Sequence, residues 1–207
     1  MVYAARTPTG GHGLDFLLAL DRQLFALLNG AGAPGWVDAF FVFITRDEGL
    51  RLPMIALWLF LLAACGPRWR RRALWLVPLV AVSDSLVSQV LKELFARPRP
   101  CHEELAGLRL LVDCGPGFSF PSSHAANMGA AGVFLMRGAR RWWWRAAVLL
   151  LPVLVAISRV HVGVHWPLDV LAGFAVGALL ALGAEAGLRR LPWRRARLAP
   201  PPDPGAA

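Results

Sequence analysis

Two long apolar runs of the chain are joined by the stretch Ser158-Arg159-Val160-His161-Val162-Gly163-Val164-His165-Trp166-Pro167-Leu168-Asp169. Within it, an arginine is followed six residues later by a histidine and four residues after that by an aspartate. Charged groups at membrane depth cost several kcal/mol unless they are paired or hydrated, so the stretch asks for a functional explanation. Because proline is favoured in the first turn of a helix, we expect a helix to begin near Trp166 and to carry the apolar run from Val170 to Leu182.

His165 would lie at the mouth of this helix, with Asp169 about one turn inside it. At this spacing the carboxylate can hold one imidazole nitrogen and leave the other nitrogen free to attack a substrate. The free amides of the helix start, together with Arg159, would favour an anion at the same place. The stretch therefore predicts a phosphate pocket that contains a nucleophile.

The composition is that of an integral membrane protein. Of the 207 residues, 57% are hydrophobic and only 17% are charged, and several apolar stretches approach the length of a membrane span. The length suits one domain, which we place at residues 1–198, followed by a Pro-rich and disordered tail at 199–207. Residues 1–13 lack the order of a cleavable signal, so we expect the first membrane helix to direct insertion.

The net charge of +9 could suggest nucleic acid, but the distribution of the basic residues argues against it. Arginines gather in three clusters that lie between apolar runs or after the last one, with no acidic residue inside them. This is the positive-inside pattern of cytoplasmic loops, and we expect no nucleic-acid partner. The clusters are Arg68, Arg70, Arg71 and Arg72; Arg137, Arg140, Arg141 and Arg145; and Arg189, Arg190, Arg194, Arg195 and Arg197.

The apolar pattern predicts an all-α bundle of five transmembrane helices, some of them short for a bilayer core of about 30 Å. Upstream, residues 14–29 mix leucines and phenylalanines with Asp15, Asp21 and Arg22, which favours an amphipathic helix at the membrane interface. Residues 36–45 form either a second interfacial helix or an early turn of the first span, and a sixth span results if 14–45 cross once. The five expected spans are Leu50 to Cys65, Ala73 to Leu91, Ser122 to Met136, Ala146 to Ile157 and Pro167 to Leu188.

On this topology, polar residues from three separate segments reach the outer ends of the spans. In the stretch 92–100, a lysine is followed by two arginines, and prolines prevent the helix from continuing. Arg99 can then turn back over the bundle and offer its planar fork to phosphate oxygens, while Lys92 supplies a point charge. The alternative is that these side chains extend into water or meet anionic head groups. The residues at this face are Lys92, Arg97, Arg99, His124, Arg159, His161, His165 and Asp169.

A further helix start is indicated by Phe120-Pro121-Ser122-Ser123-His124. The serines occupy the capping region, and the free amides there would point at whatever lies above them. His124 could donate a proton to a leaving oxygen. The simpler alternative is an ordinary helix cap followed by a histidine at the membrane boundary.

The three cysteines are too few for a disulfide framework. Cys101 and Cys114 share the outer loop and could pair in an oxidising compartment, a question that the sequence leaves open. Cys65, near a cytoplasmic boundary, suits inert packing.

A metal or haem site is an alternative because His161 and His165 have i, i+4 spacing. Gly163 and Pro167 argue against one continuous helix across the pair, and the chain has no HExxH signature. We therefore predict no metal and no cofactor, and we interpret His161 as a supporting or loop histidine. Asp84, an unusual acid within the second span, is assigned no catalytic role. Other candidate ligands would be Asp169, His102, Cys101 and Cys114.

Three motifs together closely resemble the signatures of the type 2 phosphatidic acid phosphatase family. The first is Lys92 followed after six residues by Arg99-Pro100, and the second is Pro121-Ser122-Ser123-His124. The third is Ser158-Arg159 followed after five residues by His165 and after three more by Asp169. Each is modestly specific alone, and the three together are highly specific. One departure is Ser123, where the family often has glycine, which affects the fine shape of the phosphate loop more than the chemistry.

The resemblance implies a metal-independent phosphatase without a cofactor. It implies that His165 is the nucleophile and forms a phosphohistidine, that Asp169 orients it, and that His124 protonates the leaving group. It also implies five residues that hold the phosphoryl oxygens, a role that suits fixed cations because phosphoryl transfer depends mainly on positioning and charge. These are Lys92, Arg99, Ser122, Ser123 and Arg159.

Within that family, the chain looks most like the bacterial undecaprenyl diphosphate phosphatases. The expected partners are thus a lipid phosphate substrate and the bilayer, with the oligomeric state left open. We expect a multi-pass protein of the bacterial inner membrane, with the site facing the periplasm and the C-terminus in the cytoplasm. The alternatives are a phosphatidylglycerophosphate, phosphatidic acid or lipid A phosphatase, and, outside enzymes, a lipid-binding or transporter-like bundle.

Overall fold

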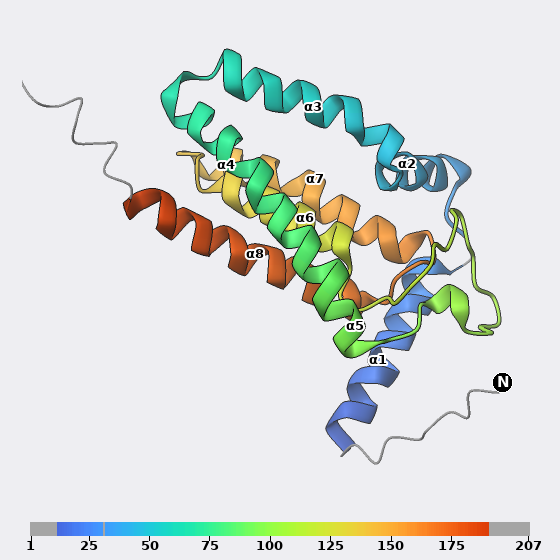
Figure 1. The fold of residues 1–207 in the computed structure, drawn as a ribbon. Helices are drawn as coiled ribbons and strands as arrows, with labels where there is room; N and C mark the ends of the chain where they lie inside the picture. The colour runs from blue at the N-terminus through green and yellow to red at the C-terminus, as the bar shows by residue number, and fades with distance from the viewer. Residues whose placement is uncertain (1–11, 31, 191–207) are drawn as a thin grey trace, which may run out of the picture.

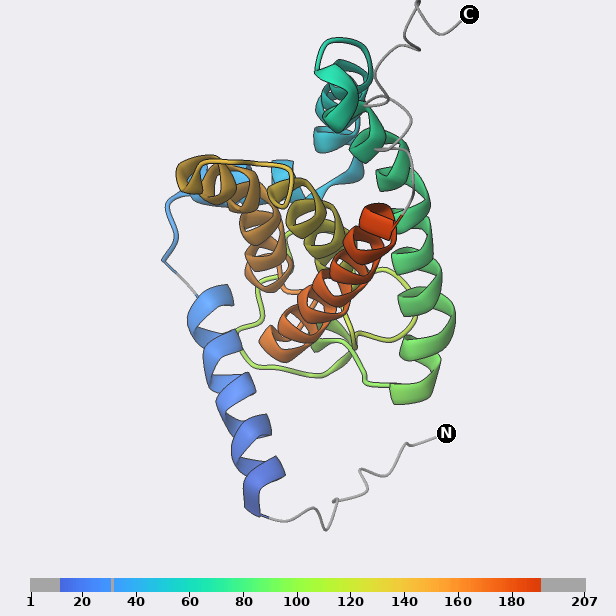
Figure 2. The same cartoon turned by 90° about the vertical axis from the view of Figure 1, so that its left-hand side faces the viewer.

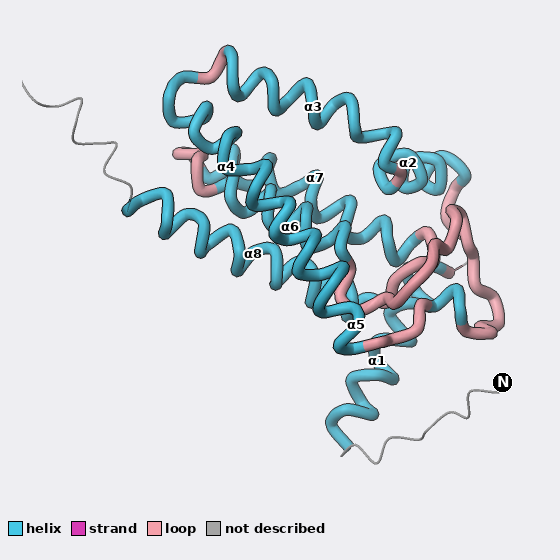
Figure 3. Tube along the Cα trace, in the orientation of Figure 1, coloured by secondary structure: helices cyan, strands magenta, loops and turns pink. Residues whose placement is uncertain are grey.

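The computed structural model describes residues 12–30 and 32–190, so the predicted tail at 199–207 lies outside the described residues. The described part is all-helical, as predicted, and contains no strand. Figure 1 shows the helices packed as a bundle, with most of the loop residues at one end (Figure 3). The elements are α1 (His12–Asn29), α2 (Gly35–Thr45), α3 (Asp47–Ala63), α4 (Gly66–Ser85), a π-helix (Leu86–Leu91), α5 (Lys92–Phe95), a 3-10 turn (Pro100–His102), α6 (Ser123–Met136), α7 (Trp142–His161) and α8 (Pro167–Arg190).

Helix α6 lies at the centre of the bundle and packs most closely against α8. Small residues allow this approach: a Cβ on Gly173 would lie 2.3 Å from the carbonyl oxygen of Ser122, and one on Gly177 would lie 2.0 Å from that of Ala126. Small residues at such an interface are typical of membrane helices, where close packing replaces the hydrophobic effect as the source of association. The start of α6 is thereby held against the first turns of α8.

Three helical runs are long and apolar enough to cross a membrane, namely Gly66–Phe95, Trp142–His161 and Pro167–Arg190. They contain three of the five predicted spans. The other two coincide with α3, of 17 residues, and α6, of 14 residues. At a rise of ~1.5 Å per residue, α6 is only about 21 Å long. The multi-pass membrane character is thus supported, and the count of five spans stays a prediction.

The described arginines of the three clusters and the loop-rich end lie at opposite ends of the bundle. The α3–α4 turn, the α6–α7 connection and the C-terminal end of α8 gather at one end, and the loop from α5 to α6 lies at the other (Figure 1). One detail of the prediction is wrong: the first cluster lies inside α4 rather than in a loop, and Arg72 is only 4% exposed. It donates to Glu185 at 2.6 Å and to the carbonyl oxygen of Phe134 at 2.5 Å. This pairing satisfies a charge that the sequence pattern alone would place in water.

Helix α1 coincides with the predicted amphipathic segment, and Asp21 on it faces the protein while Asp15 and Arg22 are exposed. Asp21, Phe25 and Asn29, spaced four residues apart, are buried against the bundle. The side chains that face outward are mostly apolar, and in two views the N-terminal half of α1 projects beyond the bundle (Figures 1 and 2). An apolar outer face suits lipid, and the interfacial position of α1 stays a prediction. The outward residues are Leu14, Phe16, Leu17, Leu20, Leu24, Leu27 and Leu28.

Helix α2 resolves one of the alternatives for residues 36–45. Arg46 is extended, with φ −78° and ψ 137°, and separates α2 from α3. The segment is therefore a helix of its own rather than an early turn of the first span. It packs against α7, which places Thr45 beside the last turns of that helix.

Candidate active site

His165 and Asp169, from the stretch between the last two apolar runs, lie in contact as predicted. Gly163, with φ 88°, turns the chain after α7, and α8 begins at Pro167. Nδ1 of His165 lies 3.4 Å from Oδ2 of Asp169, and the backbone amide of Trp166 donates to the same oxygen at 2.8 Å. His165 is 1% exposed and Asp169 is fully buried. Contact with the carboxylate at Nδ1 leaves Nε2 as the nitrogen available for attack.

Cationic residues surround His165. Burial holds the pKa of His165 well below its usual range, and the nearby charges of Arg159, Arg99, Lys92 and His124 lower it further. The imidazole is therefore neutral at pH 7, which a nucleophile requires. The backbone amide of Ser122 donates to the carbonyl oxygen of Asp169 at 2.9 Å, so the motif that carries His124 lies beside the one that carries His165. The structure thus brings the three motif segments together.

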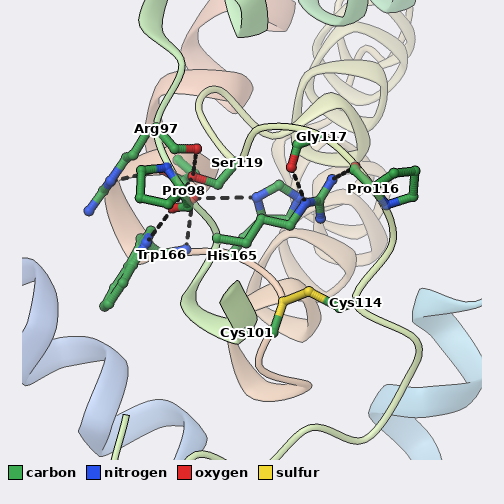
Figure 4. Close-up of a disulfide and its surroundings, with 11 residues drawn as sticks. Arg97, Pro98, Cys101, Cys114, Pro116, Gly117, Ser119, His165 and Trp166 are labelled. Atoms are coloured by element: carbon green, nitrogen blue, oxygen red, sulfur yellow. Dashed lines mark hydrogen bonds and ion pairs between the residues drawn. A yellow bond between two sulfur atoms is a disulfide. The ribbon is translucent and has the colours of Figure 1, made fainter. Parts of the chain in front are cut away.

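The loop before α6 places Arg99 over this site. Arg99 is 7% exposed, and its Nε donates to the carbonyl oxygen of Gly117 at 3.2 Å. Cys101 and Cys114 form a disulfide with a Cα–Cα distance of 6.0 Å, which answers the question that the sequence left open (Figure 4). The disulfide and the Gly117 contact tie both halves of the loop to the segment that carries Arg99.

The second motif forms a capped helix start, as predicted. Ser122 is the N-cap of α6 and accepts a hydrogen bond from the amide of Ala125 at 3.5 Å. Ser123 and His124 are the first two residues of the helix. The hydroxyl of Ser123 lies 3.1 Å from that of Ser88. The free amides of α6 and its histidine therefore belong to the end of the bundle that holds His165.

Lys92 and Arg159 are positioned by features that the sequence did not reveal. Lys92 follows directly on the π-helix of residues 86–91, whose extra residue per turn rotates the following side chains by roughly 100° relative to a continuous α-helix. Arg159 donates to the hydroxyl of Thr45 at 3.1 Å, which ties it to α2. Each cation is thus directed by a neighbouring element.

Arg97 is a site residue that the sequence did not single out. The sequence pattern places Arg97 at the outer ends of the spans, but its position next to Pro98 indicates no role. In the structure, Nη1 of Arg97 donates to Oδ1 of Asp169 at 2.8 Å. The hydroxyl of Ser119 lies 3.1 and 2.9 Å from the carbonyl oxygens of Arg97 and Pro98 and holds this segment in place (Figure 4). Only the folded loop could show this contact.

His161 supports the fold rather than the reaction. Its Nε2 lies 2.8 Å from Oδ1 of Asp38, and its Nδ1 lies 3.1 Å from the carbonyl oxygen of Leu28. His161 and Arg109 hold the pKa of Asp38 below its usual value. The imidazole thereby joins α7 to α1 and α2, as the interpretation of a supporting histidine requires.

Two of the other candidate metal ligands, Cys101 and Cys114, are bonded to each other. Within the described residues, Cys101, His102 and Cys114 have ligand atoms close together, but the two sulfurs are joined in the disulfide.

Asp84 accepts a hydrogen bond from Asn127 at 2.9 Å, so it pairs with a second polar group within the membrane region.

An apolar cavity extends through the bundle toward the arginine-rich end, where Arg68 and Arg140 line it. It has a volume of about 640 Å³ and lies between α3, α6 and α7. A smaller cavity of about 250 Å³ is lined by His124 and Thr45, and Met54 and Met128 line both cavities. The larger cavity therefore meets the cavity lined by His124 at these two methionines, and it is large enough for part of a lipid chain.

Comparison with known proteins agrees with this geometry. The sequence profile of the PAP2 superfamily matches residues 72–192, a range that includes all eight predicted site residues. The chain belongs to the PAP2 superfamily. That family is the one that the three motifs resemble. A transmembrane PAP2 type phosphatidylglycerolphosphate phosphatase from Bacillus subtilis shares the fold, with a TM-score of 0.63 at 24% identity over 86% of this chain and 88% of that chain.

Relatives within PAP2 differ in substrate. The lipid A 4'-phosphatase of Bacteroides thetaiotaomicron is 29% identical over 171 residues, covering 79% of this chain and 75% of the relative. The undecaprenyl-diphosphatase of Sulfolobus acidocaldarius is 30% identical over 167 residues, which cover 79% of this chain and 76% of that relative. The crystal structure of Aquifex aeolicus LpxE superposes with a TM-score of 0.68 at 27% identity, covering 81% of this chain and 95% of that chain. The relatives support a lipid phosphatase and leave the lipid to be determined.

Proposed function

We propose that this PAP2 protein hydrolyses a lipid phosphate or diphosphate through a phosphohistidine on His165. The observation that carries the proposal is a buried imidazole that is held by Asp169, with the charges of Arg159, Arg99 and Lys92 nearby. A neutral nucleophile among fixed positive charges is the arrangement that transfer of an anionic phosphoryl group needs.

In the first step, Nε2 of His165 attacks phosphorus, and the bond from phosphorus to the leaving oxygen breaks. His124 donates a proton to that oxygen, so the lipid product leaves as an alcohol or a monophosphate. In the second step, a water molecule attacks phosphorus, His124 takes up its proton, and the N–P bond breaks. Inorganic phosphate leaves, and both histidines return to their starting states.

Fixed cations take the part that a metal ion plays in other phosphatases. The developing charge on the equatorial oxygens is spread over Lys92, Arg99 and Arg159. Ser122, Ser123 and the free amides at the start of α6 supply further donors. Asp169 keeps the proton of His165 on Nδ1 and stabilises the positive charge that the imidazole acquires on phosphorylation.

The preferred substrate is undecaprenyl diphosphate, which would be converted to undecaprenyl phosphate during cell wall biogenesis. The apolar cavity that meets the cavity lined by His124 suits a long isoprenoid chain. The arginine-rich end lies opposite the site, which supports a periplasmic site and a cytoplasmic C-terminus in the bacterial inner membrane. The similarity to a lipid A 4'-phosphatase favours lipid A as the second candidate. Phosphatidylglycerophosphate and phosphatidic acid are further alternatives.

The test is phosphate release by purified protein in detergent with a chelator present. The panel contains undecaprenyl diphosphate, lipid A, phosphatidylglycerophosphate and phosphatidic acid, with His165→Ala assayed in parallel. We expect hydrolysis that persists in chelator, favours undecaprenyl diphosphate and is abolished by the substitution. Equal rates on several lipids would overturn the substrate preference. Lipid binding without turnover would favour the lipid-binding or transporter-like bundle.

A further inference from the structure

Arg97 is held between two buried carboxylates. Its Nη1 donates to Oδ1 of Asp169 at 2.8 Å, and its Nη2 donates to Oδ2 of Asp21 at 2.5 Å. Both carboxylate side chains are fully buried, whereas the arginine side chain is 20% exposed. The guanidinium of Arg97 therefore connects the aspartate of the active site with Asp21 of helix α1, which lies 76 positions before Arg97 in the sequence.

Asp21 also binds the helix that carries Asp169. Its Oδ1 accepts a hydrogen bond of 2.7 Å from the backbone amide of Leu168, in the first turn of α8. An acidic side chain at that position satisfies a free amide and favours the positive end of the helix dipole. Asp21 thus caps α8 from another helix and fixes Arg97 with its second oxygen.

Trp166 completes the contact between α1 and the site. Its ring centroid lies 5.0 Å from that of Phe25, and the guanidinium of Arg97 lies 5.1 Å above the ring. Its Nε1 donates to the carbonyl oxygen of Pro98 at 3.1 Å. Trp166, the residue between His165 and Pro167, is therefore enclosed by α1 and by the segment that carries Arg97.

These contacts determine how Asp169 meets the nucleophile. Arg97 occupies Oδ1, so Oδ2 is the oxygen that faces Trp166 and His165. A carboxylate fixed in this way keeps the imidazole in the tautomer that has a proton on Nδ1 and a lone pair on Nε2. Without Asp21, Arg97 would keep only one of its two carboxylate partners, Asp169, and the carboxylate of Asp169 could rotate.

We propose that Asp21 is a positioning residue for catalysis, which acts through Arg97 to fix Asp169 and thereby His165. Docking of α1 is then a requirement of the active site as well as of the fold. The inference rests on the proposed function and extends it beyond the family pattern, because the PAP2 match begins at residue 72 and does not include α1.

The test compares kcat and KM on undecaprenyl diphosphate for Asp21→Asn, Arg97→Met, Arg97→Lys and the double variant of Asp21→Asn with Arg97→Met. The matched control is Asp15→Asn, an exposed aspartate on the same helix. We expect Asp21→Asn and Arg97→Met each to lower kcat at least tenfold with KM changed less than twofold. We expect Arg97→Lys to recover part of the loss. The double variant should be no slower than Arg97→Met, because both substitutions interrupt the same series of contacts from Asp21 through Arg97 to Asp169.

A second readout separates positioning from folding and from the proposed function. Nitrogen-15 NMR of labelled histidine reports the tautomer of His165 without any turnover. We expect the proton on Nδ1 in the wild type and in Asp15→Asn, and a mixture of tautomers in Asp21→Asn, with the thermal midpoint of each variant measured alongside. An unchanged tautomer in Asp21→Asn, or a loss of activity that follows only the loss of folded protein, overturns the inference. If the wild type hydrolyses no lipid phosphate, the proposed function fails, while the tautomer still decides whether Asp21 positions His165.

Discussion

The backbone amide of Ser122 donates a hydrogen bond of 2.9 Å to the carbonyl oxygen of Asp169. This bond joins the residue before α6 to the first turn of α8, so the helix that carries His124 and the turn that carries His165 are fixed relative to each other. Gly173 allows the contact because it has no Cβ to strike Ser122. The distance between the two histidines therefore depends on the α6–α8 interface.

The first prediction concerns this interface. Gly173→Ala would place a Cβ 2.3 Å from the carbonyl oxygen of Ser122, so the two helices must separate. We expect kcat to fall at least tenfold, since displacements of about 1 Å can cost roughly 100-fold in rate. The control is Gly183→Ala on the same helix, where a Cβ meets nothing within 4 Å and should raise stability slightly. Equal activity of the two variants would contradict the account.

The second prediction concerns pH. Only the neutral imidazole of His165 can attack, and burial together with the neighbouring cations sets its pKa well below 6.5. The single-turnover rate should therefore stay level as the pH falls from 7 to 6 and should decline only when the pH passes that lowered pKa. Arg99→Gln removes one of the charges that lower the pKa, so the acidic decline should move to higher pH. A decline centred at or above pH 6.5 in the wild type would show that the imidazole is not shielded in this way.

The third prediction concerns the buried ion pair at the opposite end of the bundle. Glu185→Gln leaves the charge of Arg72 without its partner, and both side chains are almost fully buried. Removal of one member of such a pair costs about 3 kcal/mol or more of folding free energy. We expect a lower thermal midpoint with unchanged kcat for the folded fraction. Arg189→Gln is the control, because that arginine contacts Glu185 from an exposed position and should change stability by less than about 1 kcal/mol.

The fourth prediction concerns the apolar cavity. Ala147 lines it, and Ala146 is an exposed neighbour that does not. Ala147→Phe should raise KM for a long-chain substrate several-fold and leave hydrolysis of a short, soluble analogue unchanged. Ala146→Phe adds the same ring outside the cavity and should change neither the KM for the long-chain substrate nor hydrolysis of the short analogue. If both variants behave alike on the long-chain substrate, the cavity does not receive the lipid chain.

Much of this arrangement could be predicted from the sequence because the signals are local. The proline at 167 and the serine cap at 122 mark helix starts directly, and the apolar runs place most of the helices. The contact between Arg97 and Asp21 could not be predicted, because it depends on how α1 packs across the end of the bundle. The π-helix before Lys92 also has no sequence signal that we recognise. The burial of Arg72 could not be predicted, because its partner Glu185 lies 113 residues away in the sequence.

The chemistry of His165 is tested most directly by trapping the enzyme with phosphorus-32-labelled substrate and mapping the labelled residue by mass spectrometry. The wild type and His124→Gln should give a phosphoenzyme that is stable in base, labile in acid and located on His165. The His165→Ala variant should remain unlabelled and inactive although it is folded. Label on any other residue, or turnover that survives His165→Ala, would contradict the account.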